Sequence, residues 1–124
     1  MAEKIVTVCL IIVAVIHLLP LAGLAGGERL QALYGVEIAD PNLELLMRHR
    51  AVLFGLLGIG LLVGAFIPTW HAAALLAGAI SVVSFLGLAA SIPTNAEVAR
   101  VVAADWLALA ALLAGAVATA FSRL

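Results

Sequence analysis

Residues 70–92 read WHAAALLAGAISVVSFLGLAASI, and no Asp, Glu, Lys or Arg occurs among them. An α-helix rises 1.5 Å per residue, so this stretch would be about 35 Å long, which exceeds the roughly 30 Å hydrocarbon core of a bilayer. Pro68 and Pro93 bracket the stretch, and proline stops a helix because its ring clashes with the preceding turn. The stretch therefore predicts a helix that crosses a membrane.

Three other windows share this length and apolar character: residues 5–25, 43–67 and 96–121. The connections on either side of residues 70–92 are only two or three residues long, and such short turns make consecutive helices lie antiparallel. We therefore predict an all-α membrane protein in which residues 1–124 form a single domain. Its four transmembrane helices would make an up-down-up-down bundle.

The overall composition supports a membrane protein. Apolar residues make up 66% of the chain and charged residues 10%, whereas soluble domains are about half apolar and a quarter charged. The net charge of −1 provides no basic field for nucleic acid. Lys4 followed by an apolar run also fits a secretory signal peptide, but the run of about 21 residues is long enough to span a bilayer.

The longest connection, residues 26–42, has a pattern of its own. Two glycines open it, a short amphipathic stretch follows, Gly35 can end that stretch, and Asp40 starts the next helix. We predict a short interfacial helix that lies on the membrane surface and acts as a lid; a plain connecting loop is the alternative. The lid residues would be Glu28, Arg29 and Tyr34.

The two membrane faces differ in charge. Side A is defined here as the face that holds both termini, and side B as the face that holds residues 26–42. Three arginines near side B lie inside predicted helices, so we leave them out of the count of cytoplasmic cations. Arg29 then stands against Lys4 and Arg123, which favours both termini in the cytoplasm. We expect the membrane itself to be a bacterial inner membrane.

A layer of polar side chains lies about 12–15 Å below side B. Each predicted helix contributes one of them: His17, Arg50, Ser84 and Asp105. Three more lie beside this layer or above it: Arg48, His49 and Arg100. A charge at this depth costs roughly 3 kcal/mol if it faces lipid, so we expect these residues to face the bundle interior. We predict a buried ion pair between Asp105 and Arg50, with His17 or His49 within hydrogen-bond reach.

The number of polar groups in this layer favours a ligand site. A polar contact that only held the four helices in register would need one ion pair, whereas several arginines and histidines lie close to this level. We therefore predict that these seven residues bind a small anionic or amphipathic ligand, such as a lipid or quinone, in a binding or transport module. The alternatives are a subunit of a membrane redox system, in which His17 and His49 hold a haem or the site acts on quinone, and a structural or assembly protein.

No motif in the chain indicates an enzyme. The sequence contains no CxxC, HExxH or GxSxG motif and no Gly-rich phosphate loop, all of which carry recognisable chemistry. We therefore assign no catalytic residue and no metal ligand.

Small residues predict how the other half of the bundle packs. The hexapeptide ALLAGA occurs at residues 74–79 and 111–116, which places Gly78 and Gly115 at similar depth near side A. Gly60 and Gly64 form a GxxxG pair, and such residues let helix backbones approach closely. We expect a tight side A half, a wider side B half with a cavity open to that face, and self-association into a homo-oligomer through the remaining small-residue stripes.

Several segments together resemble one group of membrane proteins: IHLLP at 16–20, ERL at 28–30, LYG at 33–35, DPNL at 40–43, MRHRAVLFG at 47–55, SF at 84–85, and RVV at 100–102 with Asp105. The chain is similar to a group of small uncharacterised four-helix membrane proteins of proteobacteria, and more distantly to DoxX-like and DUF4345-like families. Some members are called phosphopantetheine adenylyltransferase, but this chain has neither the Rossmann-like sheet nor the HxGH-type phosphate site of such an enzyme. The resemblance implies the four-helix fold and marks the polar positions, and it implies no activity.

Overall fold

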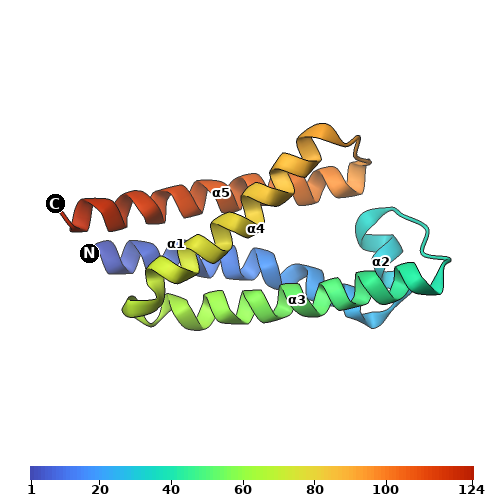
Figure 1. The fold of residues 1–124 in the computed structure, drawn as a ribbon, viewed down its shortest axis with the longest axis horizontal. Helices are drawn as coiled ribbons and strands as arrows, with labels where there is room; N and C mark the ends of the chain where they lie inside the picture. The colour runs from blue at the N-terminus through green and yellow to red at the C-terminus, as the bar shows by residue number, and fades with distance from the viewer.

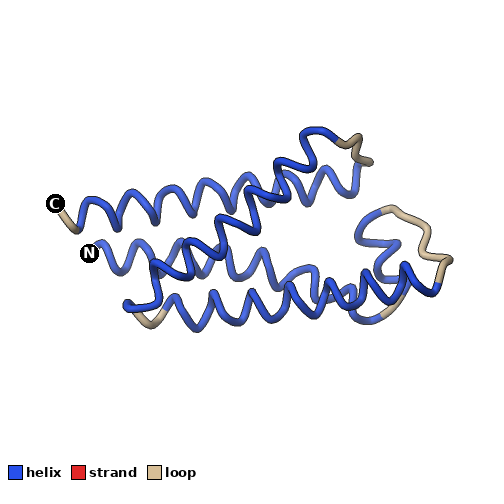
Figure 2. Tube along the Cα trace, viewed as in Figure 1, coloured by secondary structure: helices blue, strands red, loops and turns tan.

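The computed structural model describes residues 1–124, and it contains helices joined by short turns and no strands, as Figure 2 shows. The long helices are α1 (Ala2–Leu18), which continues into the 3-10 helix η1 (Leu19–Ala25); α3 (Pro41–Ala65); α4 (His71–Ser91), which follows the 3-10 turn η2 (Pro68–Trp70); and α5 (Ala96–Ser122). A short helix, α2 (Gly27–Tyr34), precedes α3. Four segments are long and apolar enough to cross a membrane, so the chain has the architecture of a multi-pass membrane protein.

The two ends of the molecule carry different parts of the chain. Both termini and the η2 turn lie at one end, and α2 and the α4–α5 turn lie at the other (Figure 1). Helix α1 packs along both α3 and α5. Helix α4 begins beside the end of α3 and finishes beside the start of α5 (Figure 1), so it contacts α5 more extensively than α3. We refer below to the termini end and the α2 end.

Three residues that the sequence marks as helix ends have that role in the structure. Asp40 accepts a hydrogen bond from the backbone N–H of Asn42 at 2.9 Å, and Asn95 accepts one from the N–H of Val98 at 2.8 Å. Such caps satisfy N–H groups that have no partner within the first turn of a helix. Gly35 ends α2 at a φ of 63°, a left-handed conformation that glycine adopts without steric cost. The predicted helix signals in this region are confirmed.

The first spanning segment, predicted as a helix over residues 5–25, is not α-helical throughout. The α-helix ends at Leu18, and the chain continues as a 3-10 helix to Ala25. Pro20 explains the change, because proline has no N–H to donate to the preceding turn. The carbonyl of Leu24 in this segment accepts a hydrogen bond from Arg48 Nε at 3.1 Å.

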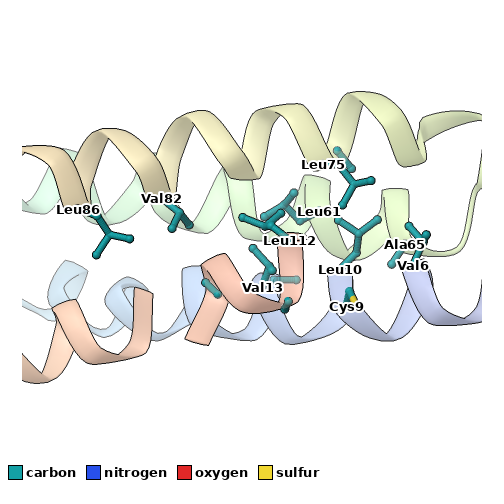
Figure 3. Close-up of a cluster of buried hydrophobic side chains, with 14 residues drawn as sticks. Val6, Cys9, Leu10, Val13, Leu61, Ala65, Leu75, Val82, Leu86 and Leu112 are labelled. Carbon is teal, nitrogen blue, oxygen red and sulfur yellow. The ribbon is translucent and has the colours of Figure 1, made fainter. Parts of the chain in front are cut away.

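Most of the apolar core lies in the termini half of the bundle, and it extends along α4 to Leu86. Figure 3 shows the side chains of α1, α3, α4 and α5 that meet there. A Cβ atom on Gly78 would lie 3.0 Å from Leu112 Cδ2, and one on Gly115 would lie 3.0 Å from Leu75 Cδ2. Each glycine thus receives a leucine from the other helix. The predicted contact between the Gly78 and Gly115 regions is confirmed.

The GxxxG pair on α3 does not act as a unit. A Cβ on Gly64 would lie 3.3 Å from Ala74 Cβ, so this glycine lets α3 and α4 approach each other. Gly60 is exposed and has no atom within 4 Å of a Cβ built on it. The expectation of close packing fails at Gly60, which lines an apolar groove between the two helices.

Two side chains secure the termini end. Thr7 Oγ1 donates to the carbonyl of Ala65 at 2.7 Å, and His71 Nε2 lies 2.9 Å from the same oxygen. Ala65 is the last residue of α3, and the final carbonyls of a helix have no partner within it. The buried His71 therefore serves to hold this helix end in place.

Candidate ligand-binding cavity

A cavity of about 280 Å³ lies at the α2 end of the bundle. Its wall is formed by α1, η1, α2, α3, α4 and α5, and most of the lining residues are apolar. The polar and charged side chains in the wall are His17, Tyr34, Arg50, Glu97, Arg100 and Asp105. The cavity therefore combines an apolar surface with a small set of charged groups, as ligand sites commonly do.

His17 is almost fully buried, with 2% of its surface exposed. Its Nδ1 lies 2.9 Å from the carbonyl of Val13, and its Nε2 lies 2.8 Å from Ser81 Oγ. A carbonyl accepts only, so Nδ1 carries the proton and donates. In the neutral ring Nε2 then accepts from the Ser81 hydroxyl. The imidazole also stacks on Phe54, with ring centroids 5.7 Å apart.

Arg50 projects from α3 onto aromatic side chains. Its guanidinium donates to the Tyr34 hydroxyl at 3.1 Å, and its central carbon lies 4.5 Å from the centroid of the Phe54 ring and 5.4 Å from that of Tyr34. A guanidinium is attracted to the electron-rich face of an aromatic ring at such distances. Arg50 is thus held in place without a carboxylate.

Tyr34 connects three parts of the fold at this point. It is the last residue of α2, its hydroxyl meets Arg50, and its carbonyl accepts from Asn95 Nδ2 at 2.8 Å. Its side chain is 7% exposed. The predicted lid residue Tyr34 therefore forms part of the cavity wall.

Asp105 does not form the predicted ion pair. It lines the same cavity as Arg50, but the guanidinium of Arg50 binds Tyr34 and stacks on Phe54 instead. Every buried side-chain oxygen or nitrogen atom has a hydrogen-bond partner. Because the carboxylate of Asp105 makes no such bond, its oxygens are accessible from the cavity.

The seven predicted site residues divide into two groups. Four of them line the cavity: His17, Arg50, Arg100 and Asp105. The other three do not. The exposed Arg48 caps the Leu24 carbonyl, and the exposed His49 lines a separate hollow. Ser84 is exposed and donates to the carbonyl of Ser81 within its own helix at 3.0 Å.

Two polar residues near the cavity were missed. Ser81, one turn before Ser84, is the residue that reaches His17, and Glu97 lines the cavity close to the start of α5. Both Ser81 and Ser84 lie in the same apolar run, and depth alone could not choose between two serines three residues apart. Glu97 lies in the first turn of α5, nearer to side B than the predicted polar layer.

The remaining lid residues lie outside the cavity. Glu28 and Arg29 are exposed and make no side-chain hydrogen bond. Helix α2 is instead anchored by Leu30, which is 1% exposed and packs so close to Gly23 that a Cβ there would lie 2.7 Å from it. The N–H of Gly27 also donates to Glu44 at 3.0 Å. Helix α2 is therefore a packed part of the fold.

The histidines do not fit a haem held between two imidazoles. Both ring nitrogens of His17 already have partners, and His49 faces a different hollow. No group of three or more His, Cys, Asp and Glu side chains is arranged to hold a metal ion. The chemistry that this wall offers is ionic and hydrogen-bonding contact with an organic ligand.

Comparisons with protein-family models, with curated proteins and with solved structures find no match to this chain. The resemblance to small four-helix membrane proteins therefore stays a prediction. A functional assignment rests on the cavity itself.

Proposed function

We propose that this chain is an integral membrane module that binds or transports a small amphipathic molecule. Its four long helices would cross a bacterial inner membrane up-down-up-down, with both termini in the cytoplasm. Helix α2 would lie at the opposite membrane surface, beside the mouth of the cavity. The ligand would combine an apolar body with an anionic or strongly hydrogen-bonding head, as a lipid or a quinone does.

The observation that carries this proposal is the state of the charged groups in the cavity. Arg50 and Asp105 are both partly buried and line it without an ion pair between them, and Arg50 has only the Tyr34 hydroxyl and two aromatic rings as partners. Glu97, in the first turn of α5, and the exposed Arg100 also line the cavity. A clasp that only held helices together would pair its charges, because an unpaired charge in an apolar environment is costly. Free charged groups around an open volume favour a ligand.

The balance of charges indicates what kind of ligand would fit. The wall contains two arginines and two carboxylates, so the cavity is not selective for anions by net charge alone. An anionic group would bind Arg50 and Arg100, which offer several N–H donors in a fixed plane. Asp105 would accept a hydrogen bond from the ligand or exchange a proton with it. Apolar side chains such as Ile16, Phe54 and Phe85 would pack against the body of the molecule.

The direct test is a native mass spectrum of the full chain purified from membranes in mild detergent. The wild type should retain an organic molecule as an added mass, and Arg50→Gln should lose it. Arg123→Gln is the matched control, because Arg123 is an exposed arginine at the far end of the bundle. If the wild type carries no added mass, the structural alternative is favoured. If Arg50→Gln keeps it, the ligand does not bind in this cavity.

A further inference from the structure

A second hollow on the molecular surface lies between α3 and α4. It is a groove of about 490 Å³ that no charged side chain lines, and the indole N–H of Trp70 is the one polar side-chain group among its lining residues. The two helices meet at one end of it, where Gly64 packs on Ala74 and Trp70. They diverge from there, and Gly60 has no neighbour within 4 Å. The groove therefore faces outward, toward the lipid in a membrane.

The other end of this groove is basic. Leu53 and Leu57 line the groove and also line an adjoining hollow of about 270 Å³. The polar groups of that hollow are His49, Arg50 and Ser81, and no carboxylate lines it. The two hollows are thus continuous along α3, apolar toward the termini end and cationic toward the α2 end.

Arg50 also joins this surface to the interior. Arg50 and Phe54 line the outward hollow and the central cavity alike, and the guanidinium lies on the Phe54 ring at 4.5 Å. These two side chains therefore form the partition between the cavity and the α3–α4 side of the molecule.

We propose that the α3–α4 groove binds a single-chain lipid with a compact anionic headgroup. The headgroup would lie against His49 and Arg50, and the acyl chain would follow α3 as far as Gly60. This inference rests on the proposed function, because Arg50 serves both the groove and the cavity. It adds the class of ligand and a route of entry from within the bilayer, past Arg50 and Phe54.

The dimensions and the charge of the groove favour this occupant. Ten residues separate Arg50 from Gly60, which is about 15 Å along a helix. That is about the length of one leaflet's chains, and because Arg50 lies about 12 Å below side B, the headgroup would lie within the bilayer and the chain would reach past its midplane. A bulk zwitterionic lipid would bring a cation toward His49 and Arg50, whereas a compact anion would complement them without any acidic neighbour in the hollow.

The test compares two carboxylates that share a headgroup and differ in chain length. The full chain in detergent is unfolded by heat with palmitate or hexanoate present, and helix content is followed by circular dichroism. Both should raise the melting temperature of the wild type, palmitate at lower concentration. In Gly60→Leu the new side chain fills the groove, so palmitate should bind about tenfold more weakly because its chain loses packing contacts, while hexanoate should be unaffected.

The chain offers a matched control in Gly87→Leu. Gly87 also has no neighbour within 4 Å and is exposed on α4. This substitution therefore adds the same side chain outside the groove and should leave the binding of palmitate and of hexanoate unchanged. Ala77→Leu fills the groove from α4 and should repeat the effect of Gly60→Leu if that variant folds poorly. Hexadecanol, which has the chain without the charge, should not stabilise the wild type.

The possible outcomes separate the two proposals. If palmitate stabilises Gly60→Leu, Ala77→Leu and the wild type equally, the groove does not hold the chain, although the cavity proposal stands. If hexadecanol raises the melting temperature of the wild type as palmitate does, the proposal that the groove selects an anionic headgroup is wrong. If neither carboxylate stabilises the wild type while an unrelated native ligand is retained, this inference fails alone. If no ligand of any kind depends on Arg50, the proposed function fails with it.

Discussion

His17 illustrates how one buried polar residue is satisfied inside an apolar bundle. Its ring bonds to the Val13 carbonyl one turn earlier in α1 and to Ser81 on α4, and it stacks on Phe54 of α3. One side chain thus connects three helices at the floor of the cavity. A buried group of this kind is costly when a partner is removed, because the remaining atom loses both water and its hydrogen bond.

The first prediction concerns this contact. Ser81→Ala should lower the free energy of unfolding by about 1–3 kcal/mol, since Nε2 of His17 is left without a partner. Ser84→Ala should have little effect, because Ser84 is exposed and bonds only within its own helix. Chemical unfolding of both variants in the same detergent would measure the difference. Equal effects would mean that the Ser81–His17 bond does not contribute to stability.

Arg50 depends on the shape of its guanidinium as well as on its charge. Arg50→Lys keeps the charge, but an ammonium group cannot lie flat on Phe54 and also reach the Tyr34 hydroxyl as the planar group does. We expect about a tenfold loss of ligand retention in the native mass spectrum, with the fold unchanged by circular dichroism. If the lysine variant retains the ligand as well as the wild type, charge alone holds it, and the stacking contacts have no role in binding.

At the scale of helices, α4 and α5 are joined by glycines that each receive a leucine. The ALLAGA repeat makes this contact reciprocal, because Leu75 packs on Gly115 and Leu112 packs on Gly78. Such packing can hold helices together in a membrane, where the hydrophobic effect no longer distinguishes protein from lipid. The tight contact at the termini end lets the α2 end of the bundle remain open.

The corresponding prediction compares two glycines of the same helix. Gly78→Val should destabilise the protein by about 1–3 kcal/mol, because its Cβ would already lie 3.0 Å from Leu112 and the branched side chain overpacks the interface. Gly87→Val should have little effect, since nothing lies within 4 Å of a Cβ there. Thermal unfolding in detergent would compare the two. A similar loss in both variants would mean that valine acts through the helix backbone and that the α4–α5 contact is unimportant.

At the scale of the whole molecule, the bundle is divided into a dense half and a hollow half. Most of the apolar core and the hydrogen bonds to Ala65 lie toward the termini end, and the cavity lies at the α2 end. The outer surface is apolar over most of its length, and large hydrophobic side chains are exposed on every long helix. A bilayer would cover this surface, and part of it is also suited to a second copy of the chain.

We predict that the chain forms a homo-oligomer through the outer small-residue faces of α4 and α5. Exposed alanines alternate there with exposed leucine and valine, and small residues let helices pack more closely with protein than with lipid. Native mass spectrometry from two detergents and from nanodiscs should show a defined multiple of the 12.7 kDa chain. A monomeric mass under all three conditions would contradict this prediction.

The sequence alone determined the four spanning segments, the helix ends at Gly35, Asp40 and Asn95, and the depth of the polar residues. These features depend on local properties: the number of consecutive apolar residues, the caps at Asp40 and Asn95, the left-handed glycine at Gly35, and the rise of 1.5 Å per residue. The cavity at the α2 end follows from the same depths, which placed His17, Arg50 and Asp105 at one level.

Only the tertiary structure decided which polar side chains face one another. It assigned the contact with His17 to Ser81 rather than Ser84, gave Arg50 to Tyr34 rather than Asp105, and left His49 outside the cavity. These outcomes depend on how far each helix is rotated about its axis. The sequence pattern of a membrane-spanning helix gives little indication of that rotation. In water an apolar stripe marks the buried face of a helix, but in lipid both faces are apolar, so the close packing of glycine, alanine and leucine between helices sets the rotation.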